Sequence, residues 1–169
     1  ANNGAETPIT FENCVIADNF AMSSWNGNGN ADGGKGGGAI YMHNAVPNMQ
    51  GFFVKFNLVN TTILYNYAQG AGGAILCKYG RSTNEFNIIN CTITENMSGA
   101  LNGNGYDAAG IRTLDADGDL SPQAMRKRIW NSIIENNHAS NPMQLNDGRP
   151  DLYYGDVNFQ NSKNKDVVA

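Results

Sequence analysis

The sequence predicts an all-β fold, a parallel β-helix of about four coils, on three observations. A segment built around two Asn residues recurs four times along the chain. Its apolar residues alternate with a period of two, which is typical of strands and not of helices. The chain also holds 20 glycines in 169 residues, which suits a fold with many tight turns.

The first element of each repeat is the Asn segment, whose copies align without gaps. Apolar residues precede the first Asn, a small residue follows it, an Ile stands three positions after it, and a second Asn stands six positions after it. The copies are ITFENCVIADN (9–19), FNLVNTTILYN (56–66), FNIINCTITEN (86–96) and KRIWNSIIENN (127–137). Because the inward side changes across the first Asn, each copy predicts two short strands joined by a bend, where Asn tolerates the left-handed backbone.

The second element is a short apolar strand that follows small residues. It is clearest as GGGAIYM (36–42) and GAGGAILCK (70–78), and weaker as DAAGIRT (107–113) and PDLYYGD (150–156). Polar inserts of variable length separate it from the Asn segment, as expected for loops on one side of a solenoid.

Each repeat therefore supplies two or three short strands, fewer than the four of a propeller blade. Coils stacked about 4.8 Å apart explain the pattern better, because stacking aligns the Asn residues into ladders and the Ile residues into one core stripe. Cys14 and Cys91 then share a small inward column two coils apart, about 9.6 Å, so we expect no disulfide between them. With Cys77 they show no metal-binding spacing.

The Asn segments and the GGAI elements together resemble the repeats of polymorphic outer-membrane proteins, in right-handed parallel β-helices of the pectate-lyase-like class. The resemblance covers about residues 9 to 160, and the family's FxxN element stands in this chain mainly as FxxxN, at 56–60 and 86–90. It implies a right-handed coil and an extracellular or bacterial cell-surface location.

Composition argues against two classes of interaction. A net charge of -4, a pI near 5.0 and the absence of a basic run in the sequence argue against nucleic-acid binding. No apolar run approaches the roughly 20 residues of a membrane span. We expect residues 1–169 to form a single β-helix segment of a larger chain or assembly. Neither end resembles a polar capping unit, so we expect another protein or further chain to cover the ends of the stack.

The segment DADGDL (115–120) is the candidate metal site. Asp115, Asp117 and Asp119 have the alternate spacing with which carboxylates converge on Ca²⁺, and the glycine between the last two eases the turn. That glycine falls one position early for an EF-hand loop, and Arg126 stands where such a loop has Glu. A calcium loop of another geometry and an acidic turn without an ion both stay open as interpretations.

Outward-facing side chains supply the candidate binding and catalytic residues. Trp25 lies in the polar insert SSWNGNGN, where its ring could contact a sugar or a protein, or fold back over a coil. Tyr65 and Tyr67 flank the second Asn of their copy and are the other candidate ligand contacts. Asp18 and Glu95 share the column of Tyr65, about two coil spacings apart, near the upper limit for an inverting carboxylate pair. An ordinary solvated face is the commoner arrangement.

Two functions from different classes follow. The first is a non-catalytic surface module, an adhesin-like segment, scaffold or accessory subunit of an envelope complex, which binds protein or glycan through its loops. The second is a polysaccharide lyase or glycoside hydrolase of the pectate-lyase-like class. The sequence shows no catalytic cluster and so favours the first. A groove that holds converged carboxylates and a basic residue would favour the second.

Overall fold

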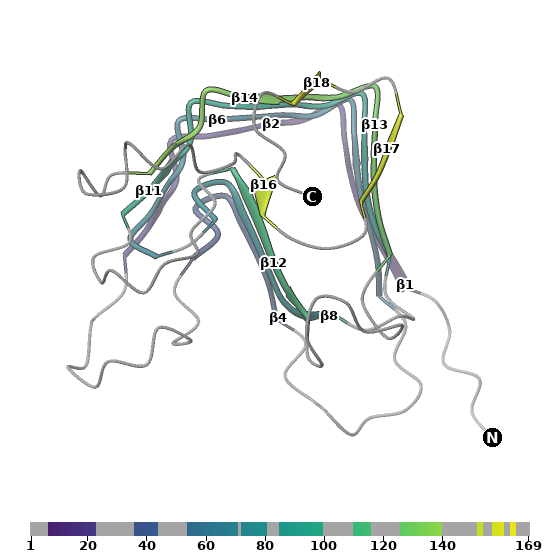
Figure 1. Ribbon diagram of the computed structural model, residues 1–169, viewed down its shortest axis with the longest axis horizontal. Coiled ribbons are helices and arrows are strands. Elements are labelled where there is room, and N and C mark those ends of the chain that lie inside the picture. Colours follow the sequence, from purple (N-terminus) through teal and green to yellow (C-terminus); the bar gives the residue numbers. More distant parts are fainter. Residues whose placement is uncertain are drawn as a thin grey trace.

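The chain is built of parallel β-strands. The computed structural model describes residues 7–22, 36–43, 54–70, 72–80, 85–99, 110–115, 126–139, 152–153, 157–160 and 163–164. Within these ranges every regular element is a strand and every sheet is parallel, so the all-β class is confirmed. Strands from equivalent positions of successive repeats lie side by side, which is compatible with a parallel β-helix (Figure 1). The described part of the chain holds no helix with the length and apolar character of a membrane span.

The described strands form four sheets. Sheet A contains β1 (Thr7–Glu12), β5 (Val54–Val59), β9 (Glu85–Ile89), β13 (Arg126–Trp130) and β17 (Val157–Gln160). Sheet B contains β2 (Val15–Ala17), β6 (Thr62–Leu64), β10 (Thr92–Thr94), β14 (Ile133–Glu135) and β18 (Lys163–Asn164). Sheet C contains β3 (Phe20–Ala21), β7 (Tyr67–Ala68), β11 (Met97–Ser98) and β15 (His138–Ala139). Sheet D contains β4 (Ile40–His43), β8 (Ile75–Gly80), β12 (Ile111–Asp115) and β16 (Leu152–Tyr153).

One repeat contributes one strand to each sheet, and we call such a set of four strands a coil. Coils 1 to 4 are β1–β4, β5–β8, β9–β12 and β13–β16, and β17 and β18 continue sheets A and B beyond coil 4. The expectation of two or three strands per repeat was therefore too low. The additional strand lies in sheet C and has only two residues, too few to show an alternating pattern in the sequence.

The strand register confirms the sequence alignment of the repeats. In sheet A, Phe11 pairs with Leu58, and in sheet B, Ile16 pairs with Ile63. In sheet D, Ile75 pairs with both Ile40 and Ile111. Register is strongly specified wherever one face of a strand is buried, because a slip of one residue would turn every core side chain outward.

The core lies between sheets A, B and D, and in Figure 1 sheet D crosses the interior of the section. Each sheet contributes columns of equivalent side chains. The buried cluster consists of Phe56, Leu58, Ile63, Ala74, Ile75, Cys77, Phe86, Ile88, Cys91, Ile93, Ile111, Ile129 and Ile134. Neither Cys14 nor Cys91 takes part in a disulfide, so the prediction that these two residues do not pair is confirmed.

The bend between sheets A and B is stabilised by the small residue that follows the first Asn of each repeat. Asn13, Asn60, Asn90 and Asn131 adopt left-handed backbone, with φ between 47° and 54°. The next residue in each copy donates from its side chain to the carbonyl two positions back: Thr61 Oγ1 to Val59 at 2.9 Å, and Cys91 Sγ to Ile89 at 3.2 Å. Cys, Thr and Ser share this column because each is small and carries a donor.

The bend between sheets B and C uses the same device, with Asn in the donor position. The left-handed residues are Asp18, Tyr65, Glu95 and Asn136. The Asn that follows Tyr65, Asn66, donates from Nδ2 to the carbonyl of Leu64 at 2.9 Å and to that of Ile16 in the preceding coil at 3.0 Å. Such side-chain bonds replace backbone pairing that a bend interrupts.

The GGAI elements form the corner between sheets C and D. Gly37 and Gly72 have φ of +70° and +67°, which side chains rarely adopt, and Gly37 N donates to Gly72 O at 2.9 Å. Gly38 packs directly on backbone: a Cβ atom at this position would lie 2.9 Å from the backbone N and C atoms of Tyr67. Glycine is therefore required where sheet D turns in beneath sheet C.

Candidate functional surface

Sheet C exposes one column of large side chains, which we call the sheet C column. It consists of Phe20, Tyr67, Met97 and His138, which stand opposite one another in the register of β3, β7, β11 and β15. The alternate positions, Ala68 and Ser98, are completely buried. The small buried residues hold the strand against the corner glycines, and so the large neighbours must point outward.

The aromatic part of this column is ordered by contacts between coils. Phe20 is 72% exposed, and its ring centroid lies 6.1 Å from that of Tyr67 with the planes tilted by 41°. A Cβ atom on Gly99 would collide with the Tyr67 hydroxyl, so the tyrosine side chain reaches over the next coil. Exposed apolar side chains that lie next to one another often mark an interaction site, whereas exposed apolar residues that are scattered singly are normal.

The bend next to this column adds polar groups to the same corner. Tyr65 is 57% exposed and precedes the buried Asn66, so Tyr65 and Tyr67 lie on the outside of one bend. In the next coil, Glu95 Oε2 lies 3.5 Å from His138 Nε2. Aromatic faces beside carboxylate and imidazole groups offer both stacking and hydrogen bonding to a polar ligand.

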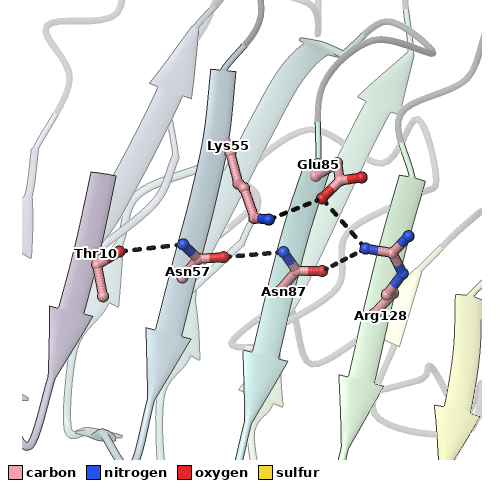
Figure 2. A network of polar contacts seen from close by, with 6 residues as sticks. All are labelled: Thr10, Lys55, Asn57, Glu85, Asn87 and Arg128. Carbon is pink, nitrogen blue, oxygen red and sulfur yellow. Dashed lines mark hydrogen bonds and ion pairs between the residues drawn. The ribbon is translucent and has the colours of Figure 1, made fainter. Parts of the chain in front are cut away.

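The outer face of sheet A carries a different feature, a row of hydrogen bonds across four coils. Arg128 Nη1 donates to Asn87 Oδ1 at 3.3 Å, and Asn87 Nδ2 donates to Asn57 Oδ1 at 2.9 Å. Asn57 Nδ2 in turn donates to Thr10 Oγ1 at 3.1 Å, so every bond points the same way along the row (Figure 2).

Two cations flank the same carboxylate at the edge of this row. Glu85 Oε2 lies 3.2 Å from Arg128 Nη1 and 3.5 Å from Lys55 Nζ (Figure 2). Burial alone would raise the pKa of Glu85, but the charges and hydrogen bonds of Arg128 and Lys55 together outweigh it and lower the pKa below its usual value. The carboxylate is therefore ionised and engaged with both cations at neutral pH, which leaves it poorly suited to act as a general acid.

The structure brings together only some of the predicted site residues. Tyr65 and Tyr67 lie at the bend between sheets B and C, and Asp18 and Glu95 occupy the same column of bends as Tyr65. Trp25, Asp117 and Asp119 lie outside the described residues, and Asp115 is described only as the last residue of β12. Among the side chains that the structure describes, no three or more of His, Cys, Asp and Glu are grouped as a metal site would need.

Sequence reasoning missed Phe20, Met97 and the polar row of sheet A. The two-residue strands of sheet C gave no pattern from which to place the first two. The polar row was readable in principle, since Thr10, Asn57 and Asn87 stand three positions before the first Asn of their copies.

Comparison of the chain with protein-family models, with curated proteins and with solved structures found no match.

Proposed function

We propose that this chain is a non-catalytic segment of a right-handed parallel β-helix at a cell surface, which binds a glycan through the corner formed by Tyr65 and the sheet C column. The handedness and the extracellular location are supported by the resemblance of its repeats to those of polymorphic outer-membrane proteins. The binding role is supported by the exposed rings of Phe20 and Tyr65 and by the partly exposed ring of Tyr67 beside Phe20.

The sheet C column, together with Tyr65 at the neighbouring bend, is the observation that carries the proposal. Sugar rings present C–H faces that pack on aromatic side chains and hydroxyl groups that bond to carboxylates and amides. Tyr65 and Tyr67 supply such faces, while Glu95 and Asn136 stand at the equivalent bends of the following coils. A rigid stack holds these groups in fixed order, so little side-chain entropy is lost on binding.

The charged groups of the described outer faces suit a binding role better than catalysis. Glu85 is engaged with Arg128 and Lys55, and Glu95 lies beside His138. Asp18 and Glu95 are separated by the coil that carries Tyr65. A hydrolase needs one raised and one lowered carboxyl pKa at a fixed separation.

A glycan array combined with turnover assays tests the proposal. The full chain is expected to bind a subset of glycans and to release neither reducing ends nor unsaturated products from them. Tyr67→Ala and Tyr65→Ala are expected to weaken binding at least about tenfold, because stacking contacts of aromatic rings are lost. Tyr41→Ala is the matched control, since Tyr41 is also exposed but lies in sheet D.

Turnover of any bound glycan would replace the proposal with the lyase or glycosidase alternative. If the same tyrosines bind a protein and the chain binds no glycan, the chain would still be a binding module, but the proposal of a glycan ligand would be wrong.

A further inference from the structure

The corner of the proposed glycan site carries carboxylates from two coils. Asp18 lies at the second bend of coil 1, where it is exposed and forms no ion pair with any side chain that the structure describes. Glu95 lies at the equivalent bend of coil 3, and its Oε2 lies 3.5 Å from Nε2 of His138 in the sheet C column. His138 is positively charged only when it is protonated. With a neutral imidazole, the described part of the corner is therefore purely acidic.

The cationic side chains that the structure describes belong to other sheets. Lys55 and Arg128 lie in sheet A, where both are engaged with Glu85, and Arg112 lies in sheet D with a buried Nε. Figure 1 shows sheets A and C at opposite ends of sheet B. The strands of sheet B in coils 1 to 4 have three residues each, about 10 Å, which exceeds the Debye length of about 8 Å at physiological salt. The cations of sheet A therefore do not neutralise the corner.

The inserts that follow sheet C in the sequence have the same sign of charge. Residues 23–35, 100–109 and 140–151 come after β3, β11 and β15, and together they contain four Asp against one Lys and one Arg. The chain segments that adjoin the corner therefore do not supply the positive charge with which an acidic ligand would pair.

A ligand that stacks along the sheet C column must pass both carboxylates. The column runs across the coils from Phe20 in coil 1 to His138 in coil 4. Asp18 precedes Phe20 by two residues, and Glu95 contacts His138, so one carboxylate stands near each end of the column. Their bends are two coil spacings apart, roughly 10 Å. An oligosaccharide with an acidic group on every sugar would therefore bring an anion close to at least one carboxylate.

We propose that Asp18 and Glu95 are specificity-determining residues of this site, and that its ligand is a glycan without acidic groups. The inference rests on the proposed glycan function and adds the class of sugar to it. Carboxylates accept hydrogen bonds from the hydroxyl groups of a neutral sugar. They repel the carboxylate, sulfate or phosphate groups of an acidic glycan, and such like-charge contacts are a common means of excluding wrong partners.

Matched pairs of glycans test the inference. Linear hexasaccharides of glucose, mannose and galactose, and any further neutral glycan that the array identifies, are each tested beside the same chain with its C6 alcohols oxidised to carboxylates. The titrations are made at pH 8, where an ordinary imidazole is neutral. At low ionic strength the full chain is expected to bind the neutral member of a pair at least about fivefold more tightly, because each exposed like-charge contact weakens binding by up to a few-fold.

Salt distinguishes charge from shape as the cause of this preference. At about 0.5 M salt the ratio of the two affinities is expected to fall to about twofold, since screening weakens the repulsion between charges but does not relieve a steric clash.

Neutral variants assign the preference to the two residues. Asp18→Asn and Glu95→Gln keep the size of each side chain and an acceptor oxygen, and circular dichroism confirms that the variants fold. In the double variant the ratio of the two affinities is expected to fall to about twofold at low ionic strength. Glu12→Gln is the matched control, since Glu12 is also exposed but ends β1 in sheet A, and it is expected to leave the ratio unchanged.

The outcomes separate this inference from the proposed function. Equal or tighter binding of the oxidised glycans, or a ratio that the double variant does not reduce, would overturn the inference and leave the glycan site in place. A ratio that does not change with salt would also overturn it, because shape and not charge would then exclude the acidic sugars. If neither neutral nor oxidised glycans bind, the proposed function itself is wrong, and the inference about specificity fails with it.

Discussion

At the scale of single residues, each bend depends on a pair of neighbours with different tasks. One residue adopts left-handed backbone, and the next donates a side-chain hydrogen bond to the carbonyl two positions back, as Thr61 does to Val59 and Asn66 to Leu64. Asn suits the left-handed position of the first bend. At the second bend that position holds Asp18 and Asn136, which tolerate the left-handed backbone, and Tyr65 and Glu95, on which it imposes a costly conformation.

Tyr65→Asn is expected to stabilise the chain by about 0.5–1 kcal/mol, because Asn adopts the left-handed conformation more readily than Tyr and the tyrosine ring is largely exposed. Urea unfolding followed by circular dichroism measures the change. Tyr65→Ala is the matched control, since it removes the ring but keeps an unsuitable residue in the bend. If the Asn variant is no more stable than the Ala variant, left-handed strain at this position is negligible.

At the scale of elements, ladders of side chains join strands that are far apart in the sequence. The ladder at the second bend runs through Asn19, Asn66, Asn96 and Asn137, and it is fully buried at Asn66 and Asn96. Each inner amide satisfies backbone groups of its own coil and of the preceding coil. The row on sheet A is more exposed and includes charges, so it should contribute less to stability.

Asn66→Ala is expected to destabilise the chain by about 3 kcal/mol. It removes two bonds donated to backbone carbonyls and leaves the donors of Asn19 without their acceptor. Asn19→Ala, at the exposed end of the same ladder, should cost less than about 1 kcal/mol. Chemical denaturation of the two variants gives the comparison. Equal losses would mean that the ladder does not gain from burial.

Glu85→Gln is expected to remove a contribution of up to about 1 kcal/mol at neutral pH. Because the pKa of Glu85 is lowered in the folded chain, that contribution is fully present above the ordinary carboxyl pKa near 4.5 and is lost as the pH falls through the lowered value. Unfolding free energies of both proteins between pH 7 and pH 3 should therefore converge at the acidic end. If the difference in unfolding free energy between the two proteins does not change with pH, the ion pairs do not stabilise the ionised carboxylate.

At the scale of the whole molecule, closure depends on how sheet D is brought beneath sheet C. The GGAI corner allows backbone to lie on backbone at Gly38, and Ile75 and Cys77 of sheet D then complete the core against sheets A and B. Without that close approach, the core would lose one of its three walls.

Gly38→Ala is expected to destabilise the chain by more than about 2 kcal/mol, because the new methyl group would meet the Gly73 carbonyl oxygen and the Tyr67 backbone. Ala39→Gly, at the neighbouring position, should cost only about 0.5–1 kcal/mol from chain entropy. Thermal unfolding of both variants measures the difference. A fully stable Gly38→Ala chain would show that the corner can open without loss of the core.

The sequence by itself determined the strands of sheets A, B and D, the columns and the first bend. Alternation with a period of two, a small donor after Asn and an Ile three positions later are local signals, and the register follows from them because a slip would bury polar groups. Tyr65 and Tyr67 could be proposed as a ligand contact for the same reason, since they flank a recognisable Asn. The two-residue strands of sheet C and the exposure of Phe20 and Met97 carry no local signal.

Only the tertiary structure decided which side chains meet across coils and which remain open. Thr10, Asn57, Asn87 and Arg128 form one row although inserts of different length separate them, because stacking depends on register and not on distance along the chain. The directions of the Asn amides in the two ladders are likewise set by neighbouring coils.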